Sequence, residues 1–402
     1  MKKIINICFF ILALIIIKGC IDPIEIKGLG YEDFLMVEAT LTDELKTQKV
    51  KLSRSFPLDS IESIKETNAI VAIKSNSNTY NFTETSDGVY TSDIQFKAEP
   101  NINYTLEIKT QNGKTWLSNS EKLTGLSTIT EVTPKKETNN VNDEGIRIYI
   151  KGKGLDENAK YFRYEYEETF QVIPPYWSET KLEIVSDEYP FSVREVDNTA
   201  NNRVCYSSQN SNTIIQKETA SLINGTLDTD ILFINKYDFA ISHRYSILIK
   251  QYVQSFNAYN YFKTLNKLST NLGSFSQSQP GFLLGNITST ENDNDKAIGY
   301  FEVVTVATKR MFLNRDDFFP RDPVDFIKEC DIIAPKLLVV PRLGIDFARS
   351  PLISALKFDW VLYKSNPDTT DPVLVGPYLL VKKECGDCRE TGTNVKPNFW
   401  ID

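Results

Sequence analysis

Short runs of β-branched and aromatic residues, separated by turn signals, are the feature that most constrains the fold of this chain. In the first third of the sequence they include "FLMVEATLTD", "NAIVAIKSN" and "INYTLEIKT". Asp87-Gly88 and Asn112-Gly113 stand between such runs, and these dipeptides suit the positive φ of tight hairpin turns. About six or seven such runs match the size of an immunoglobulin-like β-sandwich. The sequence therefore predicts this sandwich over residues 33–125.

The rest of the chain, residues 126–402, is predicted to form a larger β-rich domain with one helix and a long irregular excursion. Strand-like runs resume with "IRIYIKGKG" and "KYFRYEYEETF". The segment from His243 begins as a strand and then places apolar residues at helical spacing from Phe256 to Leu268, which indicates a helix after the strand. Residues 316–351 carry several prolines and little periodicity, so we expect an irregular path there.

Aromatic residues gather between positions 161 and 177, on a predicted strand and the loop after it. Two interpretations are open. The rings fill the core, as aromatic faces of strands usually do. Alternatively they form an exposed surface that binds a ligand or partner. The residues of that surface are Tyr164, Tyr166, Tyr176 and Trp177.

The N-terminal residues predict export and lipidation. Two lysines precede the apolar run 4–17, and a small residue stands just before Cys20. The run is short for a bilayer span but typical of a signal peptide. A cysteine at the cleavage point is typical of bacterial lipoproteins, so we expect residues 1–19 to be a lipoprotein signal peptide and Cys20 to be acylated, for example with palmitate. Residues 20–32 would then form a lipidated tether.

The charge balance argues against nucleic acid as a partner. The chain has 45 basic and 53 acidic residues and a formal net charge of −8. Nucleic-acid-binding proteins instead show basic patches or stripes, and this sequence has none. We expect no nucleic-acid binding, and contact with a membrane through the lipid anchor.

Few motifs in this chain carry catalytic chemistry. Its single histidine, His243, supports neither a His-rich metal site nor more than one candidate base. Nucleophile-elbow, P-loop and dinucleotide-binding motifs are missing from the sequence. We therefore expect no catalytic residue, no metal and no cofactor. Close carboxylate pairs, such as Asp316 with Asp317 or Asp322 with Asp325, leave a hydrolase as one alternative.

The motif Cys385-Gly-Asp-Cys388 near the C-terminus has three interpretations: half of a zinc site, a redox dithiol or a structural disulfide. An exported chain meets an oxidising compartment, and four cysteines remain beyond the lipidation site, which permit three connectivities. We expect Cys385 to pair with Cys388, and Cys205 with Cys330. We also expect an aromatic residue of the terminal "NVKPNFW" to pack back onto the second domain.

Several stretches resemble one family of Bacteroidota outer-membrane lipoproteins, those with the domain of unknown function numbered 4249. They are "GCIDPIEI", "VEATLTDE", "GVYTSDIQF", "VCYSSQNS", "GNITSTENDNDKAIGYFEV" and the ending "CGDCRETGTNVKPNFW". The resemblance runs from Cys20 to Trp400 and is most specific at the ending. It implies a lipoprotein of the outer membrane, exposed at the cell surface, that is a partner of TonB-dependent receptors. It implies no enzymatic activity.

Three functions follow as expectations. The first is a non-enzymatic accessory subunit of an outer-membrane β-barrel complex, of the TonB-dependent-receptor type. The second is a surface lipoprotein that binds peptide or glycan through the aromatic residues near Tyr166 and Trp177. The third is a hydrolase with a carboxylate pair.

Overall fold

The computed structural model describes residues 33–402 except 56–63, 220–225, 272–282, 284, 293, 323–328, 343 and 368–374. Over these residues the chain is mainly β, as predicted. None of their helices is long and apolar enough to cross a bilayer. The expected signal peptide, Cys20 and tether lie outside the described residues, so lipidation stays a prediction.

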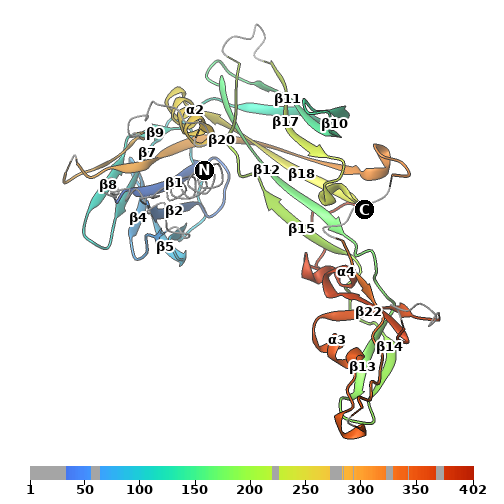
Figure 1. Ribbon diagram of the computed structural model, residues 1–402. Helices are drawn as coiled ribbons and strands as arrows, with labels where there is room; N and C mark the ends of the chain where they lie inside the picture. The colour runs from blue at the N-terminus through green and yellow to red at the C-terminus, as the bar shows by residue number, and fades with distance from the viewer. Residues whose placement is uncertain are drawn as a thin grey trace, which may run out of the picture.

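The described residues fold into three parts, which Figure 1 shows from left to lower right; the ranges that follow refer to the described residues within them. The N-terminal body comprises residues 33–122 and 285–304. The sandwich comprises residues 123–175, 203–254 and 305–319. The arm comprises residues 176–202 and 329–392. Each part has its own cluster of buried apolar side chains.

The N-terminal body is one curled run of strands around an apolar core. Its strands are β1 (Leu35–Thr42), β2 (Lys49–Arg54), β3 (Ile64–Lys65), β4 (Ile70–Ser75), β5 (Thr79–Ser86), β6 (Val89–Ser92), β7 (Asn103–Lys109), β8 (Thr115–Ser118), β9 (Glu121–Lys122) and β19 (Ile287–Ser289). Asp87-Gly88 joins β5 to β6, and Asn112-Gly113 lies between β7 and β8, as predicted. Both glycines have positive φ, +70° and +88°.

One long strand, β20 (Ala297–Asn314), runs through both the N-terminal body and the sandwich (Figure 1). Its first part pairs in parallel with β1, from Leu35 opposite Ala297 to Thr42 opposite Val304. Its second part pairs antiparallel with β18 (Arg244–Gln254) of the sandwich. A segment from late in the sequence thus completes the N-terminal body, which residues 33–125 alone do not form. The immunoglobulin-like arrangement of strands expected for this region stays a prediction.

The sandwich consists of two facing sheets with apolar side chains between them. One sheet contains β10 (Ser127–Thr138), β11 (Glu144–Gly154) and β17 (Thr226–Asn235). The other contains β12 (Tyr161–Val172), β15 (Cys205–Asn210), β16 (Ile215–Glu218), β18 and the second part of β20. A 3-10 turn, η1 (Phe239–Ile241), leads into β18. The core between the sheets includes Ile148 of β11, Phe170 of β12 and Ile247 of β18.

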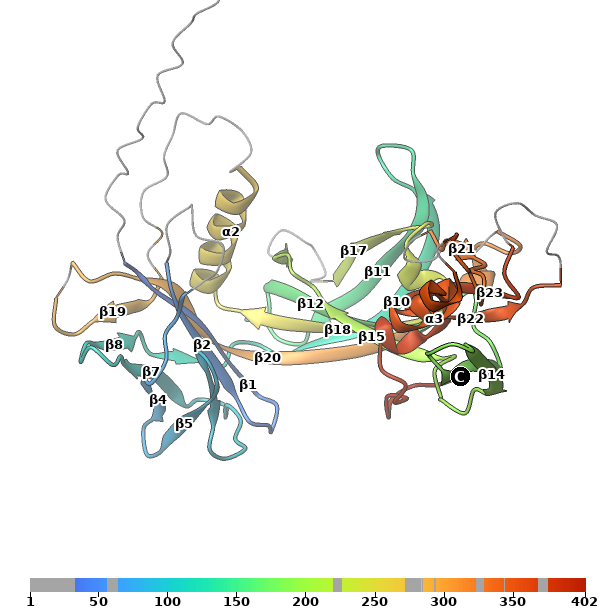
Figure 2. The ribbon, with the colours of Figure 1, turned by 60° about the horizontal axis from the view of Figure 1, so that its bottom comes forward.

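The predicted helix is α2 (Phe256–Asn271), which directly follows β18. Ala258 and Tyr261 of its buried face pack against Tyr300 of β20. The helix therefore stands over the junction between the N-terminal body and the sandwich (Figure 2).

The arm extends from the sandwich in Figure 1. It contains β13 (Thr180–Ser186), β14 (Ser192–Asp197), β21 (Ile332–Ile333), α3 (Pro351–Lys357), β22 (Trp360–Ser365), β23 (Tyr378–Lys382), α4 (Lys383–Gly386) and the 3-10 turns η3 (Ile345–Phe347) and η4 (Cys388–Glu390). Between β20 and α3 the described residues hold only β21, η2 (Arg315–Asp317) and η3 as regular elements. This agrees with the irregular excursion expected there.

All four expected cysteines form disulfides, but the expected pairing was wrong. Cys205 bonds Cys388, and Cys330 bonds Cys385. The Cys-Gly-Asp-Cys motif is split between α4 and η4, with Asp387 in an extended conformation between them. The two sulfurs therefore meet different neighbours rather than each other. The bond between Cys205 and Cys388 fastens the arm to β15 of the sandwich.

The terminal segment packs back onto the sandwich, as predicted. The Trp400 ring lies 5.0 Å from the Tyr206 ring and 5.6 Å from the Phe312 ring, centroid to centroid. Tyr206 also exchanges backbone hydrogen bonds with Thr393. Trp400 is buried, so the end of the chain is part of the folded structure.

Candidate functional site

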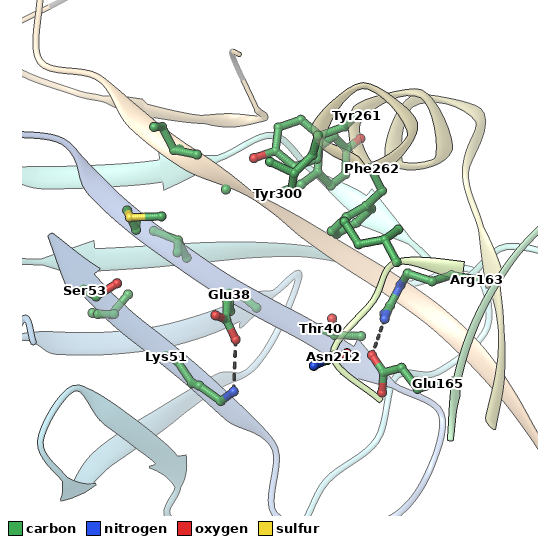
Figure 3. Close-up of a pocket in the computed structure, with 18 of the residues that line it drawn as sticks. Glu38, Thr40, Lys51, Ser53, Arg163, Glu165, Asn212, Tyr261, Phe262 and Tyr300 are labelled. Atoms are coloured by element: carbon green, nitrogen blue, oxygen red, sulfur yellow. Dashed lines mark hydrogen bonds and ion pairs between the residues drawn. The ribbon is translucent and has the colours of Figure 1, made fainter. Parts of the chain in front are cut away.

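A groove of about 570 Å³ lies where the N-terminal body, the sandwich and α2 meet (Figure 3). Its lining comes from segments that are far apart in the sequence. From the N-terminal body these are Met36, Val37, Glu38, Ala39, Thr40, Lys51, Leu52, Ser53, Lys65, Gly88 and Val89; from the sandwich, Arg163, Tyr164, Glu165, Ser211, Asn212, Thr213 and Ile214; from α2, Tyr261, Phe262 and Leu265; and from β20, Ile298, Gly299 and Tyr300.

The floor of the groove is the outer face of β1. Residues of β1 alternate between buried and accessible positions, so Leu35 and Val37 enter the core while Met36 and Glu38 face the groove. Lys51 of β2 lies opposite Glu38 in register, and their side chains form an ion pair at 3.0 Å. Both side chains are well exposed, so this pair contributes little to stability.

One wall of the groove is aromatic. Tyr261 of α2 lies 5.4 Å from the Tyr300 ring and 5.3 Å from the Phe262 ring, centroid to centroid. Burial raises the pKa of Tyr261 to about 12, so the phenol is neutral at physiological pH. The Tyr300 hydroxyl donates to Glu121 at 2.8 Å. Tyr261 and Tyr300 are buried, so of these three rings only Phe262, which is part-exposed, can contact an apolar or aromatic group.

Behind the groove, side chains from the N-terminal body and the sandwich converge on the buried Glu302 of β20. Arg163 of β12 donates to its Oε1 at 2.5 Å, Thr40 of β1 donates at 3.1 Å, and Gln254 of β18 donates to Oε2 at 2.8 Å. A buried carboxylate needs such partners, because desolvation penalises an unpaired charge. Glu302 therefore ties the N-terminal body to the sandwich.

Arg163 also pairs with Glu165, and its guanidinium lies 4.5 Å from the centre of the Tyr252 ring. Burial alone would lower the pKa of Arg163, but Glu302 and Glu165 outweigh that effect and raise it above the ordinary value. Burial would likewise raise the pKa of Glu165, whereas Arg163 lowers it overall. Both groups are therefore charged at neutral pH.

The structure does not bring the four predicted contact residues together. Tyr164 is only 1% exposed, lies in the sandwich core and donates to Gln251 Oε1 at 2.8 Å. Tyr166 packs against the same core and is half-buried. Tyr176 and Trp177 lie where the arm begins, with Tyr176 against the Tyr363 ring. The core interpretation holds for Tyr164, and these residues do not form one exposed surface.

The other sequence candidates lie away from the groove. Asp316 and Asp317 of η2 are exposed, and Asp325 lies outside the described residues. His243 precedes β18, and burial lowers its pKa. Among the described residues, no group of three or more His, Cys, Asp or Glu side chains could hold a metal ion.

Sequence reasoning missed the network around Glu302. The available signal was a charged residue in the middle of the apolar run "GYFEVVTV", where a buried strand rarely accepts one without a partner. Arg163 stands in the aromatic strand "YFRYEY" in the same way. No pattern connects these two positions, because their pairing depends on which strands are neighbours.

A comparison with protein families matches residues 21–310 to the model described as "Domain of unknown function (DUF4249)". The chain belongs to this family. The DUF4249 range covers more than half of the chain and contains every residue that lines the groove. It ends within β20, so the Cys-rich ending lies beyond the DUF4249 match. No curated protein matches the chain.

Proposed function

We propose that this DUF4249 protein is a non-enzymatic lipoprotein of the outer membrane, exposed at the cell surface, that acts as an accessory subunit of a β-barrel complex. The partner is a barrel of the TonB-dependent-receptor type. The N-terminal sequence supports the anchor, with a lipoprotein-like signal and a cysteine at position 20. Two or more acyl chains on the N-terminal cysteine would hold such a chain on a membrane without a spanning helix.

The groove between the N-terminal body and the sandwich is the observation that supports a binding role. Its floor is a strand face with charged and thioether groups, and its wall is a set of aromatic rings. Sites that bind polypeptide segments combine apolar walls with a few polar groups in this way. We infer that an extended loop of the barrel partner lies along β1 in the groove.

Site-specific crosslinking tests this role. A photo-crosslinking amino acid replaces Met36, which is 36% exposed on the groove floor. The matched control replaces Ile70 of β4, which is 68% exposed and does not line the groove. In cells of the source organism we expect Met36 alone to crosslink to a β-barrel protein. Equal crosslinking from both positions, or none to a barrel, would contradict the proposal.

The anchor is tested separately. Cys20→Ser removes the acylated thiol, so the protein should move from the membrane to the soluble fraction. The mass of the wild-type N-terminal peptide should include acyl groups. An unmodified Cys20 would contradict the anchor, and so would a Cys20→Ser variant that stays with membranes after a wash that releases proteins held only by a partner protein.

A second candidate is a surface lipoprotein that binds free peptide or glycan. The part-exposed aromatic ring of Phe262 in the groove favours it, rather than the residues first predicted from sequence. The same purified protein distinguishes the two: saturable binding to a peptide or glycan array, lost in Phe262→Ser, supports this candidate. A β-barrel protein that crosslinks to Met36 in a one-to-one ratio supports the accessory-subunit role.

A further inference from the structure

A second cleft, of about 410 Å³, lies in the arm, between the hairpin of β13 and β14 and the elements around β22. This arm cleft is lined by described residues throughout, and it shares none of them with the groove. Its lining includes Leu182 of β13, Asn198 after β14, Trp360 of β22, Gly386 of α4 and Arg389 of η4. Cavities of about 300–1,000 Å³ hold small molecules, so the arm cleft is large enough for a small ligand.

One part of the arm cleft is apolar and borders the core of the arm. Leu362 of β22 is buried in that core, and Leu182, Leu356 and Trp360 pack against it. All four residues line the cleft, and Trp360 is part-exposed. This part of the lining therefore offers aliphatic and aromatic surface to the C–H groups of a ligand.

Another part of the lining is a chain of hydrogen-bonded polar side chains. Asn198 Nδ2 donates to Ser178 O at 3.0 Å and lies 3.4 Å from Asn202 Oδ1. The Asn202 side chain bonds to Asp387, and Arg389 Nε donates to Asp387 Oδ1 at 2.9 Å. All five residues line the cleft, and Asn202 and Asp387 are buried. The contacts join these residues into one polar network beside the apolar part.

The Cys-Gly-Asp-Cys motif fixes the backbone of this network. Cys385 bonds Cys330 and Cys388 bonds Cys205, so a disulfide holds the chain on each side of Gly386-Asp387. Both residues between the cysteines line the arm cleft. A site that is fixed before its ligand arrives loses less conformational freedom on binding.

The two residues between the cysteines also suit this position. A Cβ at Gly386 would lie 2.6 Å from Val361 Cγ2, so there is no room for a side chain. Burial would raise the pKa of Asp387, but hydrogen bonds from Arg389 help to lower it overall, so the carboxylate is charged at neutral pH. Asp387 accepts from both Nε and Nη2 of Arg389, which sets the plane of the guanidinium.

The network still has one unused acceptor and one unused donor. Asn198 Oδ1 accepts no hydrogen bond from a described residue, and Arg389 Nη1 donates none to one. Asn198 is half-buried and Arg389 is exposed, so a ligand in the cleft can reach them. A ligand that satisfies both atoms has to donate as well as accept.

The arm cleft carries no surplus charge. Each basic side chain of its lining already has a carboxylate partner: Lys181 with Glu183, Lys383 with Glu390 and Arg389 with Asp387. An ionic ligand would therefore lose hydration without gaining an unpaired counter-charge. The balance favours a neutral ligand.

We propose that the arm cleft binds a neutral saccharide. Sugar hydroxyl groups both donate and accept, so they would donate to Asn198 Oδ1 and accept from Arg389 Nη1. The C–H groups of the sugar ring would pack against Trp360 and Leu182. This site is separate from the groove and does not depend on the barrel partner.

Saccharide binding by the full chain tests the proposal, with Cys20→Ser used throughout so that no acyl chain contributes. The neutral probes are glucose, galactose, mannose, N-acetylglucosamine, maltose, cellobiose and lactose, and the anionic probe is octanoate. Saturation-transfer NMR and calorimetry measure binding. We expect saturable binding of at least one sugar. Failure of every sugar to bind, or binding of octanoate alone, would overturn the proposal.

Two variants test the polar contacts. Arg389→Lys keeps a cation beside Asp387 but removes Nη1, and Asn198→Ala removes the free acceptor. Each should weaken sugar binding by about tenfold, since each removes a hydrogen bond to the ligand. The matched control is Arg203→Lys, because Arg203 is an exposed arginine beside the arm that lies 5.1 Å from the Trp177 ring and does not line the cleft. Unchanged binding by Arg389→Lys would contradict the proposal.

The location of the sugar is measured directly. Ala200 lines the arm cleft and is part-exposed, so Ala200→Phe should fill the cleft and abolish binding while circular dichroism matches the parent protein. Sugar should change the tryptophan emission of the parent but not that of Trp360→Phe. Full binding by Ala200→Phe together with loss of binding in Phe262→Ser would assign the sugar to the groove and overturn the proposal.

Discussion

The two joints of this molecule are built in opposite ways. The N-terminal body and the sandwich share one strand, β20, and the buried charges of Arg163 and Glu302. The arm is instead fastened to the sandwich by the disulfide between Cys205 and Cys388. The first joint depends on burial and backbone pairing, whereas the second depends on an oxidising compartment. The groove is at the first joint, so its shape does not require a disulfide.

Removing the cation at the first joint should have the largest effect. Arg163→Met leaves Glu302 buried with only neutral donors, and we expect the free energy of unfolding to fall by about 3–5 kcal/mol. Chemical denaturation measures it. The double variant Arg163→Met with Glu302→Leu should recover much of the loss, because no unpaired charge remains. An Arg163→Met variant as stable as the wild type would contradict the stabilising role of the Arg163–Glu302 pair.

Breaking the covalent joint should have a smaller and more local effect. Cys205→Ser with Cys388→Ser should cost about 2–4 kcal/mol, and hydrogen exchange should rise in the arm. The groove strands β1 and β20 should keep their protection. The control, Cys330→Ser with Cys385→Ser, removes a bond that lies within the arm and should leave the segment around Cys205 protected. Increased exchange in β1 would show that the two joints are coupled.

Glu168 provides the smallest test, because it is a buried carboxylate with no cation partner among the described residues. Burial raises its pKa above the ordinary 4.5, although hydrogen bonds from Tyr245 and Gln209 oppose the shift. The unfolded chain therefore ionises first, and stability should fall as pH rises from about 4.5 through the pKa of the folded state.

Glu168→Gln should remove this part of the pH dependence. Urea denaturation of both proteins across the acidic range measures the difference between them. A slope of equal size in the two proteins would assign the pH dependence to another group. Glu168 is buried without a cation, whereas Glu302 is buried beside Arg163. The stability change in Glu168→Gln therefore reports burial alone, and that in Arg163→Met reports the ion pair.

Local patterns predicted the local structure well. Alternation and the Asp-Gly and Asn-Gly turns indicated the hairpins of the N-terminal body, and helical spacing after β18 indicated α2. Alternation tells which face of a strand is buried but not which strand lies beside it. The pairing of β1 with β20 was therefore beyond sequence reasoning, and the groove and the network around Glu302 depend on that pairing. The cysteine pairing failed for the same reason, since three connectivities were open.

The pairing of β1 with β20 also sets an order for folding. β1 is among the first strands of the described chain to be made, and its parallel neighbour does not exist until Val304 has been added. Until then one edge of β1 has unpaired backbone groups, which other strands can bind. We expect the part of the protein that comes first in the sequence to finish folding late. A chaperone would be of most use to this chain in that interval.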